Sequence, residues 1–139
     1  MSKYKLTVII PVYNAKNYIC RCLNSLINQS YKDFCVIIVD DASNDGTKEI
    51  IENSIIDQPN MKCVSLTENH GQSYCRNIGI EMATTQFITF LDADDYIDIL
   101  TYSKCLQQNP ETYDVIIYGL AYDYTKTNII EKKYVLLSF

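Results

Sequence analysis

Mostly apolar blocks recur along the 139-residue chain, and polar segments separate them. Five of these blocks are short and rich in β-branched or aromatic residues, which is typical of strands that are buried on both faces. They are LTVIIPV (6–12), FCVIIVD (34–40), KCVSLT (62–67), FITFL (87–91) and YDVIIYGL (113–120). Pro11 should fall at the end of the first strand, because proline cannot donate a hydrogen bond to a central ladder.

Segments with a helical period lie between these strands. The first has apolar residues at the i, i+3, i+4, i+7 and i+8 positions of an amphipathic helix. These are Ile19, Cys22, Leu23, Leu26 and Ile27. The second, SNDGTKEIIENSII, offers Ser43 and Asp45 as caps for a helix that buries Ile50, Ile51 and Ile55. Two further helices are predicted over GQSYCRNIGIEMA (71–83) and DILTYSKCLQQNP (98–110).

Strands that alternate with helices at this spacing predict an α/β domain with a mostly parallel, Rossmann-like sheet flanked by helices. No linker or internal repeat interrupts the pattern, so residues 1–139 are expected to form one domain, with 121–139 only partly strand. Ligands of such open sheets bind outside the carboxyl ends of the strands. The residues at those ends therefore indicate the function.

Composition excludes several classes of protein. A hydrophobic content of 47% with 21% charged residues belongs to ordinary globular domains. The net charge of −5, without any run of Lys or Arg, argues against a nucleic-acid partner. An anionic ligand would need a metal ion or aimed backbone N–H groups to offset the acidic background.

The six cysteines lie mostly among apolar residues, which predicts reduced core thiols instead of disulfides. Cys20-Arg21-Cys22 lacks the CxxC spacing of a zinc site. The opening MSKYKLTVIIPVYN has an apolar run too short to span a bilayer and no cleavage pattern. We expect a cytoplasmic protein without a transmembrane segment, for which peripheral membrane association stays open.

Two groups of carboxylates follow predicted strands. Asp40 and Asp41 come at the end of the second strand, and Asp92, Asp94 and Asp95 follow the fourth. Alternate residues of an extended segment point the same way, so Asp92 and Asp94 can address one ligand. A Mg²⁺ or Mn²⁺ ion shared with substrate phosphates would relieve the repulsion. A solvated acidic turn and a helix cap are the structural alternatives.

Four motifs in order carry a specific resemblance. VIIPVYNAKNYI, VDDASNDGT, the N-x-G-x-x-x-x-R-N run of NHGQSYCRN, and FLDADD are similar to the nucleotide-binding half of family 2 glycosyltransferases, which have the GT-A fold. The resemblance covers residues 5 to about 98 and fades afterwards. It implies that the acceptor-binding portion is truncated.

The resemblance implies a role for each residue of the first two motifs. Pro11 and Tyr13 would line the base pocket, with the Tyr13 ring against the nucleobase. Asp41 would accept a hydrogen bond from the base, which for uracil means N3–H. The alternatives are that Tyr13 only covers the end of the sheet and that Asp41 caps the next helix.

The later motifs imply the contacts with ribose and diphosphate. Asp92 would bind the ribose, and Asp94 would hold the divalent metal, Mn²⁺ or Mg²⁺. Arg76 would contact phosphate, or else pair with a helix carboxylate. His70, the single histidine, is expected in a loop.

The reaction implied is transfer of a sugar, expected from a UDP-sugar, to a hydroxyl of a saccharide or other acceptor, with inversion. The general base is not identifiable in this chain, because the resembled family carries it in the acceptor-binding portion. A truncated or minimal form is therefore expected, and a non-catalytic nucleotide-sugar-binding module is the first alternative. A phospho-accepting receiver is the second, although receivers place their acidic pair after the first strand and need a lysine after the fifth.

Overall fold

The structure is a computed structural model that describes residues 2–106, 121–124 and 129–132. The chain divides into two compact units, which are Met1–Ile99 and Leu100–Phe139. The second unit contains α4 (Thr101–Leu106) and an antiparallel pair, β5 (Ala121–Tyr124) and β6 (Ile129–Lys132). The strand predicted over 113–120 lies outside the described residues. The organisation into one domain stays a prediction.

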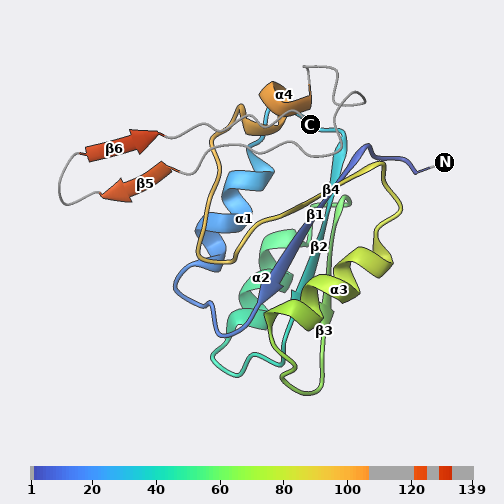
Figure 1. Cartoon of the computed structure of the whole chain (residues 1–139). Helices are drawn as coiled ribbons and strands as arrows, with labels where there is room; N and C mark the ends of the chain where they lie inside the picture. The colour runs from blue at the N-terminus through green and yellow to red at the C-terminus, as the bar shows by residue number, and fades with distance from the viewer. Residues whose placement is uncertain (1, 107–120, 125–128, 133–139) are drawn as a thin grey trace. The chain divides into compact units, whose positions relative to one another are not determined.

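A four-stranded parallel sheet forms the centre of the first unit, in the order β3-β2-β1-β4 (Figure 1). The strands are β1 (Leu6–Val12), β2 (Phe34–Asp40), β3 (Met61–Ser65) and β4 (Phe87–Phe90). All seven residues of β1 are buried, because this central strand is covered on both faces. The first four predicted strands and the parallel sheet are confirmed.

Three helices cover this sheet, α1 (Ile19–Ile27), α2 (Thr47–Ile55) and α3 (Gln72–Met82). Figure 1 shows α1 and α2 on one side of the sheet and α3 on the other. The predicted stripe of α1 is buried except for Ile27, which is partly exposed. Helix α4 begins three residues after the start of the helix predicted over 98–110, and residues 107–110 of that prediction lie outside the described residues.

Pro11 lies one residue before the end of β1, as its missing N–H predicts. Val12 faces β2, since its carbonyl accepts from the Asp41 N–H at 2.8 Å. Ile9 faces β4 and accepts from the Leu91 N–H at 3.1 Å. Alternation therefore turns Pro11 towards β4, whose pairing with β1 has ended at Ile9. The proline costs no ladder bond at this position.

Helix α3 packs closely against the sheet at Gly79. A Cβ atom on Gly79 would lie 2.3 Å from Cγ2 of Ile9, so only glycine permits this contact. Near it, a small cluster of Ile37, Val39 and Cys75 joins the helix to β2. This packing fixes where the first turns of α3 stand relative to the strand ends.

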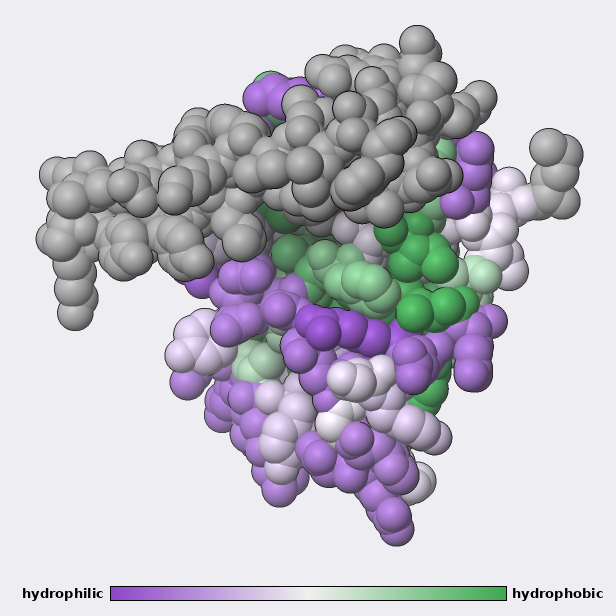
Figure 2. All heavy atoms as spheres, in the orientation of Figure 1, coloured by the Kyte–Doolittle hydropathy of each residue, from purple (hydrophilic) through white to green (hydrophobic). Residues whose placement is uncertain are grey.

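The prediction for α2 is wrong in part. Only Ile51 of the three isoleucines is buried, whereas Ile50 and Ile55 are partly exposed. The reason is that α2 packs against α1 and the edge strand β3, which together cover a narrow stripe. Figure 2 shows the molecule in the orientation of Figure 1. Hydrophilic side chains cover the lower part of the visible surface, where the strands of Figure 1 end.

Candidate functional site

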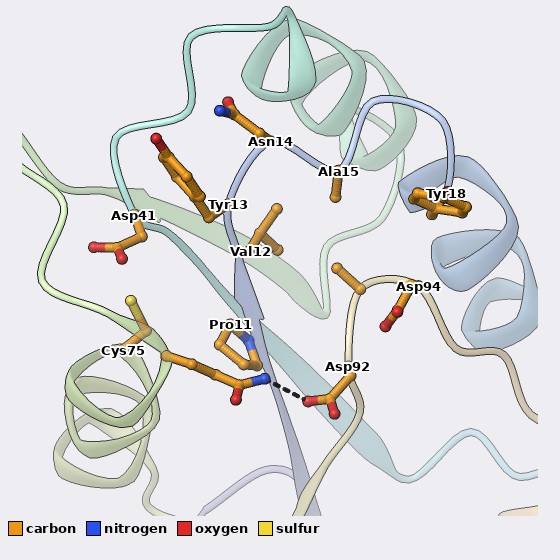
Figure 3. A pocket seen from close by; sticks show the side chains of 12 residues that line it. Pro11, Val12, Tyr13, Asn14, Ala15, Tyr18, Asp41, Cys75, Asp92 and Asp94 are labelled. Carbon is orange, nitrogen blue, oxygen red and sulfur yellow. Dashed lines mark hydrogen bonds between the residues drawn. The ribbon is translucent and has the colours of Figure 1, made fainter.

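A pocket of about 390 Å³ opens at the carboxyl ends of β1, β2 and β4 (Figure 3). Its lining comprises twelve residues, Pro11, Val12, Tyr13, Asn14, Ala15, Tyr18, Asp41, Gln72, Cys75, Asp92, Ala93 and Asp94. Five of the six residues singled out from the sequence are among them, and the sixth, Arg76, binds one of the five. The structure therefore brings segments far apart in sequence to one edge of the sheet.

Tyr13 presents its ring at this edge with 51% of its surface exposed. The next residue, Asn14, has a left-handed backbone (φ 47°) and is bound to the loop after β2. Its N–H donates to Ser43 Oγ at 2.9 Å, and its Oδ1 accepts from the Asn44 N–H at 3.0 Å. These reciprocal bonds fix the turn that carries Tyr13 and leave its aromatic face available to a flat ligand.

The same bonds correct the cap prediction for Ser43, whose hydroxyl serves Asn14 and not the next helix. Asp45 does act near that helix: its Oδ1 accepts from the N–H and the hydroxyl of Thr47, the first residue of α2. Its other oxygen accepts from the Lys16 N–H at 3.2 Å. The hydrogen bond from Thr47 lowers the pKa of Asp45, so this link persists at neutral pH.

Asp41 is buried, with 2% of its surface exposed, and its carboxylate binds the chain just before α3. Oδ1 accepts from the His70 N–H at 2.8 Å, and Oδ2 accepts from the Gly71 N–H at 2.7 Å. The position near the N-terminus of α3 favours a negative charge. The Cys75 thiol also hydrogen-bonds to this carboxylate, which with about four lone-pair sites can still accept a bond from a ligand donor. Asp41 is therefore an anchor for residues 70–71 as well as a pocket acceptor, and no hydrogen bond joins its side chain to α2 within the described residues.

Cys75 lines the pocket beside Asp41 (Figure 3) and is fully buried. Burial, with the neighbouring Asp41 carboxylate, raises the pKa of Cys75 to about 11. The thiol is therefore protonated at neutral pH, which makes it a poor nucleophile and a poor metal ligand. All six cysteines are free, as predicted, but only Cys22 and Cys75 lie in the core, whereas Cys20 is exposed and the other three are partly exposed.

Asp92 is held by two side chains of α3. Arg76 Nη2 lies 2.7 Å from Asp92 Oδ1, and Gln72 Nε2 donates to the same oxygen at 3.0 Å, the bond drawn in Figure 3. Arg76 thus pairs with the end of β4 and not with a carboxylate of its own helix. Within the described part of the chain, Oδ2 of Asp92 accepts no hydrogen bond and remains open to a ligand hydroxyl.

Asp94 is exposed at the other side of the pocket, near Tyr18 (Figure 3). Among residues 2–106, 121–124 and 129–132, no group of three His, Cys, Asp or Glu side chains could hold a metal ion by itself. Mg²⁺ and Mn²⁺ bind through one or two carboxylates together with substrate phosphates and water. The donor set therefore fits a metal shared with a diphosphate and does not form a preformed cage.

Several pocket residues were missed from the sequence, namely Asn14, Tyr18, Gln72 and Cys75. Gln72 could have been found, since it stands one turn before Arg76 on the same face of α3. His70 lies in the loop before α3, as predicted, with its ring centroid 4.5 Å from that of Tyr74.

The parallel sheet with a pocket at its carboxyl edge has the GT-A fold, as solved structures with similar chains show. The crystal structure of S. aureus TarS 1-349 in complex with UDP-GlcNAc matches with a TM-score of 0.70 and 35% identity, over 78% of this chain and 32% of that chain. The mannosyltransferase PcManGT from Pyrobaculum calidifontis, in complex with GDP-Man and Mn²⁺, matches with a TM-score of 0.73 and 25% identity, over 84% of this chain and 36% of that one.

The chain belongs to glycosyl transferase family 2, whose model matches residues 7–137. The teichoic acid poly(glycerol phosphate) polymerase of Staphylococcus epidermidis is 44% identical over 66% of this chain and 13% of its own length. Glycosyltransferase GlyA of Streptococcus pneumoniae is 41% identical over 68% of this chain and 13% of its own. The chain therefore spans about an eighth of the length of these two relatives. In the described part of the chain, no helix is long and apolar enough to cross a membrane.

Proposed function

We propose that this chain binds a nucleotide sugar, a UDP-sugar in the first place, as the donor-binding part of an inverting glycosyltransferase. The observation that carries the proposal is the convergence of Tyr13, Asp41, Asp92 and Asp94 on one pocket at the carboxyl edge of a parallel sheet. Family membership and the UDP-GlcNAc complex of TarS support this donor class.

The roles follow from the geometry of each group. The exposed Tyr13 ring offers a face for the base, Pro11 lines the same pocket, and the buried Asp41 offers an acceptor for uracil N3–H. Asp92, with Oδ1 held by Arg76 and Gln72, presents its other oxygen to the ribose hydroxyls. Arg76 orients Asp92 through this ion pair, and a direct contact with the donor phosphates stays a prediction.

Asp94 would hold Mn²⁺ or Mg²⁺ together with the donor diphosphate. Such an ion, when bound, stabilises the negative charge that develops on the leaving diphosphate. The complex of PcManGT with Mn²⁺ supports a divalent metal in the family. An exposed carboxylate at the rim, with its backbone fixed, suits a ligand that must also bind the donor.

The acceptor hydroxyl needs a general base, and the three pocket carboxylates are assigned to the donor. We therefore propose that the 139-residue chain alone binds donor but transfers sugar slowly. General-base catalysis contributes ~10²–10⁴-fold, and lost acceptor positioning costs more. UDP release from UDP-sugars, with and without acceptor glycans, measures this. Acceptor-stimulated turnover of ~1 s⁻¹ or faster would place a base within these residues. Binding without turnover leaves the non-catalytic module as the function of the chain itself.

Calorimetry with UDP tests the donor proposal directly. Binding should be about tenfold or more tighter in Mn²⁺ or Mg²⁺ than in chelator, since a bare diphosphate is repelled by the acidic edge. Asp94→Ala should remove this gain without loss of melting temperature. Asp57→Ala, which removes an exposed carboxylate outside the pocket, is the matched control and should keep the gain. Absence of UDP binding under both conditions would overturn the proposal, and equal binding under both would remove the metal from it.

A further inference from the structure

Residues 92–98, here called the acidic segment, leave β4 without entering another strand or helix. Within the segment, a backbone hydrogen bond runs from the Asp95 N–H to the Asp92 carbonyl at 3.0 Å. A stretch with so little regular pairing gains its conformation from its neighbours. Figure 3 shows the chain that carries Asp92 and Asp94 running beside α1, the helix that follows Tyr18.

One side of α1 binds the backbone of the acidic segment at successive points. Cys22 Sγ donates to the Asp92 carbonyl at 3.7 Å, and Arg21 Nη2 donates to the Asp94 carbonyl at 3.0 Å. Further along both chains, Ser25 Oγ accepts from the Ile97 N–H at 3.2 Å. Arg21 and Cys22, in the first turn of α1, bind the beginning of the segment, and Ser25, one turn later, binds Ile97, so α1 holds the path of the segment at several points.

The fourth contact completes this series deep in the unit. Gln29 is fully buried, and its Nε2 donates to the Asp98 carbonyl at 2.7 Å. A buried amide is destabilising unless it is hydrogen-bonded, so this bond ties the C-terminal end of the segment to the residues that directly follow α1. The contacts of Cys22 and Gln29 belong to the core. Arg21 is exposed, and its bond lies at the pocket.

Arg21 is itself held in place by an aromatic ring. Its guanidinium carbon lies 4.4 Å from the centroid of the Tyr96 ring, within the range of a cation–π contact. The planar guanidinium can stack on the ring and still donate in its own plane. The Asp94 carbonyl accepts this hydrogen bond, so the guanidinium of Arg21 contacts the segment on both sides of Asp95.

We propose that Arg21 is a positioning residue for Asp94: it fixes the backbone from which this carboxylate reaches the pocket, an inference that rests on the proposed function. Asp94 is exposed, so its own side chain is not oriented by packing. A carboxylate that binds a shared metal loses less entropy when its backbone is already fixed. Groups that orient a metal ligand typically contribute 10–100-fold to metal affinity.

The test compares three variants of the 139-residue protein by the ratio of UDP dissociation constants in chelator and in Mn²⁺. Arg21→Ala should lower this ratio on the order of tenfold, with the affinity for uridine and for UDP in chelator unchanged. Arg21→Lys, which keeps the charge but lacks the planar group, should recover only part of the ratio. Asn24→Ala, an exposed position of the same helix, should behave as the wild type.

A second readout does not depend on ligands. Hydrogen exchange of a peptide covering 92–98 should be faster in Arg21→Ala and unchanged in Asn24→Ala. If Arg21→Ala lowered the UDP affinity in chelator by the same factor as in Mn²⁺, Arg21 would bind phosphate directly. If Arg21→Lys restored the full ratio of dissociation constants, the positive charge alone would matter. Either result overturns the positioning role. If Mn²⁺ did not increase the UDP affinity of the wild type, the proposed role of the metal would be wrong. If Mn²⁺ increased the UDP affinity of Arg21→Ala as much as that of the wild type, only the positioning role of Arg21 would be wrong.

Discussion

Arg76 and Asp92 form an ion pair, with Nη2 2.7 Å from Oδ1, that joins α3 to the end of β4. The two side chains come from the third and fourth motifs of the sequence, and the pair is partly exposed, at 31% and 40%. Gln72 donates to the same oxygen, so one face of α3 orients the carboxylate. We therefore infer that this ion pair mainly orients a pocket carboxylate and is not mainly a core contact.

Replacing Arg76 by methionine tests this assignment. Unfolding free energy should fall by less than ~1 kcal/mol, because partly exposed pairs contribute little. UDP affinity should fall on the order of tenfold, because Asp92 loses a partner that orients it. Denaturant unfolding and calorimetry measure the two effects. Lys48→Met, which breaks the exposed Lys48–Glu52 pair at 4.0 Å, is the control and should leave UDP binding unchanged. A loss of several kcal/mol in stability would instead make the Arg76 pair a structural lock.

Cys75 should resist alkylation in the folded protein at pH 8. The thiolate is the reactive form, and burial with Asp41 raises the pKa of Cys75 to about 11. Its reactivity should therefore rise only as the pH approaches that value, whereas the exposed Cys20 should be labelled first. Mass spectrometry of peptides after iodoacetamide treatment gives the rates. The unfolded protein serves as the control, and equal rates for Cys20 and Cys75 at pH 8 would contradict the expectation.

The sheet and the positions of the strand-end carboxylates were predictable because they depend on local signals. Continuous apolar runs rich in β-branched residues, such as 6–12 and 34–40, are typical of buried strands, and parallel strands place their carboxyl ends at one edge. The partners of the site residues depend on distant segments instead. Asp41 binds two backbone N–H groups, which no side-chain pattern records.

The errors have the same origin. Serine is a favoured residue for a helix N-cap, yet the hydroxyl of Ser43 binds Asn14, a residue of another loop. Ile50 and Ile55 have the period of a buried stripe, but α2 covers an edge strand and leaves them partly exposed. The local sequence is compatible with several environments for such residues, and tertiary packing decides which of them is formed.

Gly79→Ala should destabilise the protein, although alanine normally improves a helix by ~1 kcal/mol. The new Cβ would lie 2.3 Å from Ile9 Cγ2, and overpacking of a buried contact costs ~1–3 kcal/mol. Denaturant unfolding measures the change. Asn77→Ala, an exposed position of the same helix, should change stability by less than ~0.5 kcal/mol.

A double-mutant cycle locates the cause of that loss. Ile9→Ala alone should cost ~2–5 kcal/mol through the cavity that it leaves. Because it also removes the atoms that collide with the new Cβ, the double variant should be more stable than the sum of the two single losses predicts. Additive losses would show that the strain at Gly79 comes from elsewhere.

Asp41→Asn should have two separable effects. The amide group cannot accept from both the His70 and the Gly71 N–H, so one buried donor loses its partner at a cost of ~1–3 kcal/mol in stability. Thermal or denaturant unfolding measures this loss. Asp57→Asn, the same change at an exposed site, should be neutral. Unchanged stability would mean that the anchor to residues 70–71 is not important for the fold.

The second effect concerns the base, and N3-methyl-UDP isolates it. If Asp41 accepts uracil N3–H, the wild type should prefer UDP to the methylated nucleotide by ~10–100-fold, and Asp41→Asn should reduce this preference strongly. If Asp41 serves only as the anchor, any preference arises from the bulk of the methyl group and is the same in both proteins. Calorimetry with the two nucleotides gives the ratio for each protein. The ratio is independent of a general loss of stability or affinity, so an unchanged value in the folded variant would exclude Asp41 from base recognition.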